Sequence, residues 1–221
     1  MSASGHAAAL PLVLLGAGGH AKVLLGLARA AGHVVVGVCD PALQRERVGM
    51  WCGITVLGGD EALEAMNPQS HALVNAIGPL PGRDARRRLY ERHREMGFVF
   101  PALVHPFSWV DASVDLADGV QVMAGAVIQP DCTIGANTTI NTRASVDHDC
   151  RVEAHVHIAP GATLCGSVSV AHGAYIGAGA TIIQGLRVGA EAIVGAGTTC
   201  VRSVEPGAVV LGASARARPR S

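Results

Sequence analysis

Hydrophobic residues recur every six positions through the second half of the chain, from Val114 to Cys200. In each hexad, one position holds a small or aliphatic residue, and the position two residues later holds Leu, Ile or Val in every hexad but the last. The residues between them are rich in Gly, Asn and Asp, which favour turns. An α-helix repeats about every 3.6 residues and an ordinary strand about every two, so neither explains this period.

The six-residue period predicts a left-handed parallel β-helix over residues 105–204. Each hexad would form one flat side, three hexads would complete one coil, and the inward aliphatic side chains would stack from coil to coil. The register is not interrupted, so we expect no long loop to leave the coils. An irregular β domain with a chance repeat is the alternative, and it does not explain so many consecutive hexads.

The first half of the chain alternates short apolar runs with amphipathic stretches, which is typical of a small parallel α/β sheet. The expected strands are residues 12–15, 33–39, 72–77 and 98–104, and the expected helices are residues 21–31, 60–66 and 81–96. We therefore predict an α/β plus all-β protein, with a small Rossmann-like N-terminal domain followed by the left-handed parallel β-helix. The predicted parts are a disordered N-terminus (1–10), the Rossmann-like domain (11–104), the β-helix (105–204) and a C-terminal tail (205–221).

Composition narrows the class of protein. Hydrophobic residues make up 49% of the chain and aromatic residues only 3%, so Val, Ile, Leu and Ala must fill the core. Lys and Arg number 17, as do Asp and Glu, and this balance gives no indication of a nucleic-acid or membrane partner. The apolar run at residues 7–15 is too short to span a bilayer, and none of the six cysteines forms a CxxC pair. We expect a reduced, soluble, cytoplasmic protein.

The turn Gly16-Ala-Gly-Gly-His20 lies between an expected strand and an expected helix. Glycines at such a turn let backbone N–H groups approach a phosphate at the positive end of the helix. Asp40, at the end of the second expected strand, lies where a ribose usually binds in such folds. The motif alone is weak, because such a loop can also be only a tight turn. The domain is short for a full dinucleotide-binding fold, so NAD binding is not expected.

A second cluster, Asp147-His148-Asp149, occupies one of the hexad turns. His148 falls at the corner of its hexad, so its imidazole should point outward. A histidine can take up a proton near neutral pH, and a neighbouring carboxylate raises its basicity. The alternative is a solvated polar turn. A metal site formed by His148, His155 and His157 is conceivable but less favoured, and we expect no metal.

Three arginines, at positions 86–88, follow one another on the expected helix at residues 81–96. Glu91 and Glu95 lie near them on that helix. A solvated, salt-bridged face is therefore the default interpretation.

The chain resembles the bacterial sugar acyltransferases of the PglD/NeuD type. The resemblance rests on the hexapeptide repeat, on the opening motif Gly-Ala-Gly-Gly-His-Ala-Lys and on the stretch from Ile140 to Cys150, Ile-Asn-Thr-Arg-Ala-Ser-Val-Asp-His-Asp-Cys. It implies homotrimers that bind acetyl-CoA in the groove between neighbouring β-helices. The C-terminal Gly212-Ala-Ser-Ala215 departs from the family pattern, so contacts to the adenine end of CoA are open.

The resemblance also implies a role for individual residues. His148 would be the general base, Asp149 would raise its basicity and Asn141 would help to arrange the site. The residues implied in acetyl-CoA binding are His157, Gly166, Ala178 and Ala196. The residues implied in binding the nucleotide of the acceptor are Gly18, Gly19, His20, Asp40 and Gly78.

Three functions remain to be compared. The first is acetyl-CoA-dependent N-acetylation of a nucleotide-linked 4-amino-4,6-dideoxysugar in surface glycan biosynthesis. The second is O-acetylation of a sugar hydroxyl, as on sialic acid. The third is a non-catalytic solenoid used for assembly, for which a plain Gly or Asn turn would be expected in place of Asp-His-Asp. The sequence does not identify the sugar or the nucleotide.

Overall fold

A parallel sheet forms the centre of the N-terminal domain in the computed structural model, which describes residues 10–213. The strand order is β3-β4-β2-β1-β5, with β3 antiparallel to β4 and the other pairs parallel. The strands are β1 (Leu12–Leu15), β2 (Val35–Cys39), β3 (Met50–Trp51), β4 (Ile54–Gly58) and β5 (Ala72–Asn75), and the helices are α1 (Gly19–Ala30), α2 (Pro41–Arg45), α3 (Asp60–Glu64) and α4 (Ala85–Glu95). The predicted α/β domain is thereby confirmed.

Two faces of this sheet carry separate apolar clusters. Leu12 and Leu14 of β1 face the cluster that includes α1, whereas Val13 and Leu15 face the cluster that includes Tyr90 of α4. This alternation follows from the two-residue period of a strand. All four residues of β1 are buried, as expected for a central parallel strand covered on both faces.

Several elements of this domain differ from the expectation. The hairpin of β3 and β4 and the short helix α2 were not predicted. The expected strand at residues 98–104 is wrong, because only Val99 forms a bridge to β5. Phe98 and Phe100 are instead core residues, and the segment ends in β6 (Leu103–Val104), which pairs with the β-helix.

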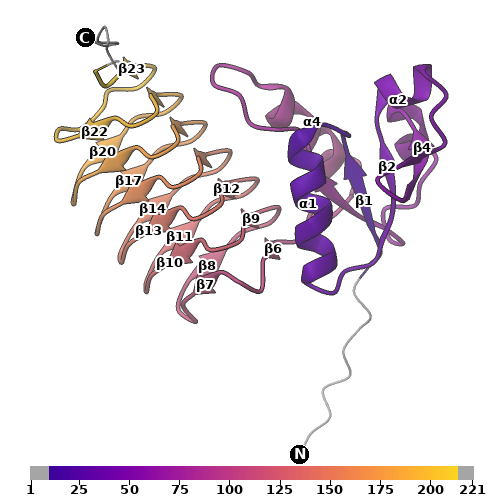
Figure 1. The fold of residues 1–221 in the computed structure, drawn as a ribbon, viewed down its shortest axis with the longest axis horizontal. Coiled ribbons are helices and arrows are strands. Elements are labelled where there is room, and N and C mark those ends of the chain that lie inside the picture. Colours follow the sequence, from indigo (N-terminus) through magenta and orange to yellow (C-terminus); the bar gives the residue numbers. More distant parts are fainter. Residues whose placement is uncertain (1–9, 214–221) are drawn as a thin grey trace, which may run out of the picture.

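The β-helix is built from two-residue strands, and from β6 to β19 each strand pairs in parallel with the strand eighteen residues further along, whereas β21 pairs with β23 sixteen residues on. Its three sheets have the orders β22-β19-β16-β13-β10-β7, β20-β17-β14-β11-β8 and β23-β21-β18-β15-β12-β9-β6. In Figure 1 the coils extend away from the N-terminal domain. The strands after β6 are β7 (Trp109–Val110), β8 (Asp115–Leu116), β9 (Gln121–Val122), β10 (Val127–Ile128), β11 (Thr133–Ile134), β12 (Thr139–Ile140), β13 (Ser145–Val146), β14 (Arg151–Val152), β15 (His157–Ile158), β16 (Thr163–Leu164), β17 (Ser169–Val170), β18 (Tyr175–Ile176), β19 (Thr181–Ile182), β20 (Arg187–Val188), β21 (Ile193–Val194), β22 (Thr199–Cys200) and β23 (Val209–Val210).

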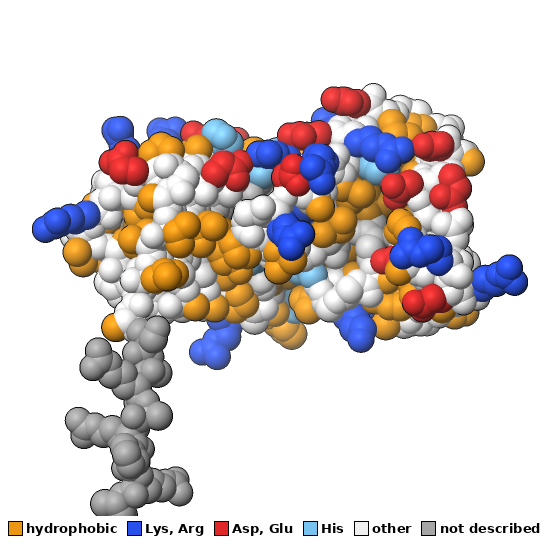
Figure 2. All heavy atoms as spheres, turned by 90° about the horizontal axis from the view of Figure 1, so that it is seen from above, with side chains coloured by type: hydrophobic (Ala, Val, Ile, Leu, Met, Phe, Trp, Pro, Cys, Tyr) orange, Lys and Arg blue, Asp and Glu red, His pale blue; other side chains and the backbone are white. Residues whose placement is uncertain are grey.

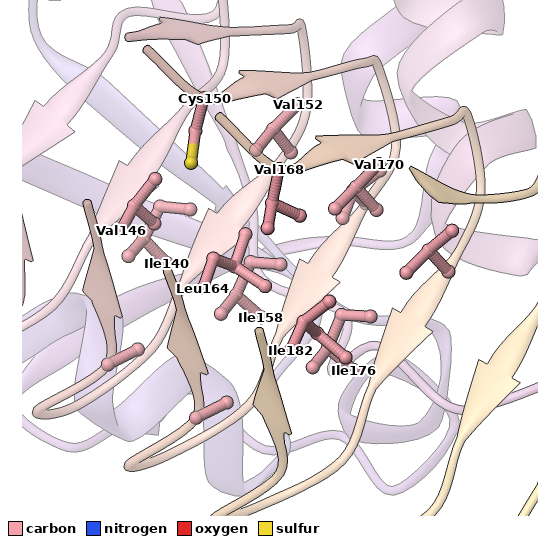
Figure 3. Packing of buried hydrophobic residues seen from close by; sticks show 14 of the residues in the cluster. Ile140, Val146, Cys150, Val152, Ile158, Leu164, Val168, Val170, Ile176 and Ile182 are labelled. Carbon is pink, nitrogen blue, oxygen red and sulfur yellow. The ribbon is translucent and has the colours of Figure 1, made fainter. Parts of the chain in front are cut away.

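The second residue of each strand points into the coils. Figure 3 shows Val146, Leu164 and Ile182 together in this interior, with Cys150 among its packing residues. Each turn places one residue in the left-handed region, and this position recurs every six residues from Gly119 to Gly197. The predicted repeat is therefore confirmed in both its inward and its turn positions.

The ends of the β-helix extend past the expected boundaries. β6 pairs with β9, so the first coil begins before residue 105. β23 pairs with β21, so the coils continue past residue 204. Residues 1–9 and 214–221, which include most of the expected disordered N-terminus and the end of the expected tail, lie outside the described residues.

Charge is mixed over the surface. On the face shown in Figure 2, Lys and Arg side chains lie close to Asp and Glu side chains along one edge of the molecule. This agrees with the equal numbers of acidic and basic residues in the sequence. Among residues 10–213, no helix is both long and apolar enough to cross a bilayer.

Candidate active site

The turn between β13 and β14 presents an exposed histidine–carboxylate pair. Nδ1 of His148 lies 2.7 Å from Oδ2 of Asp149. The backbone N–H of His148 donates to Oδ1 of Asp147 over 2.9 Å, and the N–H of Asp149 donates to the carbonyl of Pro130 over 3.1 Å. Asp149 has a φ of 59°, so the left-handed position of this turn is occupied by an aspartate. The turn therefore holds the imidazole and its carboxylate partner in one fixed arrangement.

The hydrogen bond to Asp149 is the main reason why the pKa of His148 is raised from its ordinary value, and the charges of Asp147 and Asp149 add to the effect. A carboxylate accepts hydrogen bonds, so Nδ1 of the neutral ring carries the proton. Nε2 is then the basic nitrogen. His148 is thus suited to take up a proton from a bound nucleophile.

Gly166 lies directly under this imidazole, in the next coil. A Cβ atom at position 166 would lie 2.7 Å from Cε1 and 2.7 Å from Nε2 of His148. The φ angle of Gly166 is outside the left-handed region, so space for the ring, and not backbone conformation, is what favours glycine. The structure therefore places Gly166 beside the basic nitrogen, which the sequence did not indicate.

Asn141, Ala178 and Ala196 lie at a different corner of the β-helix. Asn141 follows β12, and its Oδ1 accepts from the backbone N–H of Thr142 over 2.7 Å. Ala178 and Ala196 are exposed and stack in successive coils of this corner, where the N–H of Gly197 donates to the carbonyl of Ala178 over 2.8 Å. The described residues show no hydrogen bond between Asn141 and either His148 or Asp149. Within one chain, the sheet that contains β13 separates these two groups.

His157 lies on the outer face of a third region, the sheet of β9, β12, β15 and β18. Its side chain is only 5% exposed, and its ring lies 4.9 Å from that of Tyr175. Burial, and then the charge of Arg86, lower its pKa to about 3. Nδ1 of His157 is buried without a hydrogen-bond partner among the described residues. His148, His155 and His157 therefore lie apart, and no group of three metal-ligating side chains comes together within residues 10–213.

A cavity of about 710 Å³ opens at the carboxyl ends of β1 and β2. Leu15, Gly16, Cys39 and Asp40 line it on the strand side, and residues of α3 and α4 line it opposite. Asp40 is held in place by backbone N–H groups, since Oδ2 accepts from Ala17 over 2.9 Å and Oδ1 accepts from Ala42 over 2.8 Å. Asp40 thereby links the Gly-rich turn to α2, and it also lines the cavity.

The Gly-rich turn ends at the N-terminus of α1, where Gly18 and Gly19 are exposed and have open space around them. His20 turns instead toward the β-helix, with Nε2 at 3.1 Å from Oε1 of Gln121. Gly78 adjoins it, because a Cβ atom there would lie 3.4 Å from Cβ of His20. Burial, and then the charge of Arg86, lower the pKa of His20 to about 4.

Both halves of the chain match known families. The family described as the PglD N-terminal domain matches residues 11–93, and the family described as bacterial transferase hexapeptide (six repeats) matches residues 131–166. No match was found among curated protein sequences.

Solved structures match nearly the whole chain. A perosamine N-acetyltransferase mutant from Caulobacter crescentus, in complex with CoA and GDP-perosamine, is 38% identical and covers 91% of this chain and 93% of its own, with a TM-score of 0.84. The acetyltransferase domain of PglB from Neisseria gonorrhoeae, in complex with acetyl coenzyme A, is 34% identical and covers 91% of this chain and 96% of its own, with a TM-score of 0.85. WeeI from Acinetobacter baumannii is 24% identical and covers 92% and 97%, with a TM-score of 0.81, and supports the fold alone.

The chain belongs to the PglD-type sugar acetyltransferases. The resemblance inferred from the sequence is therefore confirmed, and the chain is an acyltransferase. The interpretation as a non-catalytic assembly protein is not supported.

One part of this acetyltransferase escaped the sequence analysis. The three arginines at positions 86–88 were expected on a solvated face, and this holds for Arg87 and Arg88, which pair with Glu191 and Asp84 at 2.7 Å each. It is wrong for Arg86, which is only 8% exposed. The sequence of three consecutive arginines does not indicate which of them the second domain covers. Only the packing of the two domains shows that it is Arg86.

Proposed function

We propose that this acetyltransferase moves the acetyl group of acetyl-CoA to the amine of a nucleotide-linked 4-amino-4,6-dideoxysugar. The observation that carries the proposal is the pairing of His148 with Asp149, which leaves Nε2 free to act as a base. The N-acetyltransferase from Caulobacter crescentus, with its bound CoA and GDP-perosamine, supports the choice of an amine on a nucleotide sugar.

In the proposed reaction, the amine nitrogen attacks the thioester carbonyl while Nε2 of His148 takes up one of its protons. A carbon–nitrogen bond forms, the carbon–sulfur bond breaks, and the CoA thiolate leaves and then takes up a proton. The thiolate is a good leaving group, so the step needs neither a covalent enzyme intermediate nor a metal. Asp149 stabilises the imidazolium that forms on His148.

The N-terminal domain would bind the nucleotide of the acceptor. Gly18, Gly19 and the N-terminus of α1 offer free N–H groups to the phosphates, which carry negative charge. The cavity beside Asp40 is large enough for a nucleoside. His20 and Gly78 lie between this turn and the β-helix, where the sugar would pass toward the second domain.

A homotrimer would complete the acetyl-CoA site. The outer face of the sheet β22-β19-β16-β13-β10-β7 is uncharged, and its outward residues are Trp109, Val127, Ser145, Thr163, Thr181 and Thr199. The corner with His148 borders one edge of this sheet, and the corner with Asn141, Ala178 and Ala196 borders the other. If three chains packed on this face, the His148 corner of one chain would lie opposite the Asn141 corner of the next chain, with a groove between them. Sedimentation equilibrium should therefore give a trimer, and a stable monomer at micromolar concentration would contradict the proposal.

His157 and Gly166 are proposed to contact acetyl-CoA as well. Gly166 supports this because it adjoins Nε2 of His148, where the reacting groups must meet. His157 supports it through its buried Nδ1, which no group within residues 10–213 contacts by a hydrogen bond. Because acetyl-CoA and nucleotide sugars are metabolites of the cytoplasm, we place the reaction there, as a step of surface glycan biosynthesis.

A thiol-release assay tests the proposed function. Acetyl-CoA is supplied with UDP-, GDP- and dTDP-linked 4-amino sugars, with CMP-sialic acid and free sialic acid as hydroxyl acceptors. We expect release of CoA only with amino sugars that carry a nucleotide, because the phosphates bind the first domain. Turnover of sialic acid alone would replace the proposal by O-acetylation, and the same sugar without its nucleotide serves as the control.

A further inference from the structure

Arg86 lies in the joint between the two domains. It sits on α4 of the N-terminal domain, and its NH1 donates to the carbonyl of Asn75 over 2.7 Å and to that of Ile77 over 2.9 Å. Its NH2 points across the joint and donates to Oγ1 of Thr139 over 3.3 Å. The end of β5 and the outer face of the β-helix are therefore held by one guanidinium group.

The positive charge of Arg86 has no acidic partner in the part of the chain that the structure describes. Among residues 10–213, no ion pair joins it to a carboxylate. The carboxylates of the surrounding elements bind other groups: Glu191 binds Arg87, Asp84 binds Arg88, Asp118 binds Tyr90 and Arg94, and Glu91 lies beside His155. Burying a charge without a partner of opposite charge is unfavourable, so its presence in the joint calls for a function.

Three histidines adjoin the hydrogen-bond partners of this charge. His157 pairs with Thr139 across neighbouring strands, His20 contacts Gln121, which accepts from Thr139, and His155 contacts Asn137. Burial and the charge of Arg86 both lower the pKa values of His20, His155 and His157. Glu91 acts on His155 in the opposite direction, and Arg87 and His172 act on it in the same direction as Arg86. Tyr175 stacks on His157 from the next coil. The pKa of Arg86 itself is lowered to about 9 by burial, so the group stays charged at neutral pH.

We propose that Arg86 is a positioning residue for acetyl transfer, which joins the nucleotide-binding domain to the β-helix face of His157 and sets its positive charge beside His20 and His157. This inference rests on the proposed function, since it assigns His148 as the group that changes protonation during the reaction. His148 lies at another corner, beside two aspartates, where its basicity is raised. In this arrangement His148 takes up the proton of the acceptor amine, and His20 and His157 do not.

The hydrogen bonds of Gln121 also fix the tautomer of His20. Nε2 of Gln121 donates to the carbonyl of Asn75 over 2.8 Å, so its Oε1 faces His20 as an acceptor. Nε2 of His20 must then carry the proton, which leaves Nδ1 as a hydrogen-bond acceptor. A neutral His20 in this tautomer suits a hydroxyl or amine of the acceptor. The phosphates are therefore left to the N–H groups of Gly18 and Gly19.

NMR titration of the histidine rings in the wild-type protein tests this proposal without a change in its joint. We expect the signals of His20 and His157, assigned with His→Gln variants, to stay constant between pH 5 and 8, while the signal of His148 titrates. If His20 or His157 titrates near the ordinary value of 6.5, the proposal is overturned. The titration does not require acetyl transfer, so inactivity toward every acceptor would contradict the proposed function without deciding the role of Arg86.

Variants of Arg86 provide a second test. Arg86→Gln removes the charge, so the pKa values of His20 and His157 should rise, and activity at pH 5.5 should fall about tenfold more than activity at pH 8. Arg86→Lys keeps the charge and should restore the wild-type pH profile. Arg88→Gln is the matched control on the exposed face of α4, where Arg88 pairs only with Asp84 near the start of the same helix. If Arg86→Gln and Arg88→Gln give the same pH profile, the role is only structural and the proposal is wrong. If Arg86→Gln does not fold, Arg86→Lys and the wild-type titration decide.

Discussion

We expect His148→Ala to lower kcat by about 10²–10⁴-fold and to leave the affinity for acetyl-CoA nearly unchanged. The imidazole is exposed and makes its one side-chain hydrogen bond with Asp149, so its loss removes the base and leaves the coils intact. Steady-state kinetics with a nucleotide-linked amino sugar measure kcat. Calorimetry measures the affinity for acetyl-CoA.

His172→Ala is the matched control for this variant. His172 is also an exposed turn histidine beside a carboxylate, with Nδ1 at 3.6 Å from Glu153, but it lies at another corner of the β-helix. It should retain wild-type kcat. If His148→Ala kept near wild-type kcat at pH 7.5, the base would have to be assigned elsewhere, and His155 would be tested next.

Asp149→Asn should reduce kcat less than His148→Ala, because the base itself remains. Asp149 raises the pKa of His148, so a neutral amide in its place lowers that pKa. The unprotonated form of His148 is then available at lower pH, and the acidic limb of the pH–rate profile should shift downward. A limb that stays in place would show that Asp149 does not set the basicity of His148.

Gly166→Ala should lower kcat by about 10–100-fold although it adds one methyl group. The new Cβ atom would lie 2.7 Å from Nε2 of His148, which forces the ring away from the position where it meets the acceptor. The backbone of Gly166 is outside the left-handed region, so alanine should not strain the turn, and the melting temperature should change little.

The double variant Gly166→Ala/His148→Ala distinguishes displacement of the His148 ring from a general loss of activity. If the methyl group acts by displacing the imidazole, Gly166→Ala should have no further effect on kcat in the His148→Ala background. Equal fold-reductions in both backgrounds would show that position 166 acts independently, through acetyl-CoA alone. Gly26→Ala in α1, where an added Cβ atom meets nothing within 4 Å, controls for the substitution itself.

The β-helix was predictable because its pattern is local and strictly repeated. A hexad register places each aliphatic residue inward and each turn residue outward, so the corner position of His148 followed from counting. The N-terminal domain was predictable only in part. β3 and β4 are short strands of a hairpin, and the segment around Phe98 is apolar without forming a strand, since its rings fill the core instead. Apolar runs of a few residues do not distinguish these outcomes.

The sequence by itself thus determined the class of both domains, the register of the coils and the histidine–carboxylate pair at residues 148 and 149. Only the tertiary structure decided which outward residues are covered. His157 and Thr139 lie on the outer face of their strands and are buried because the N-terminal domain packs on them, and Arg86 is buried on the other side of the same contact. Contacts between segments far apart in the chain depend on how two surfaces fit, and a repeat within one segment carries no information about that fit.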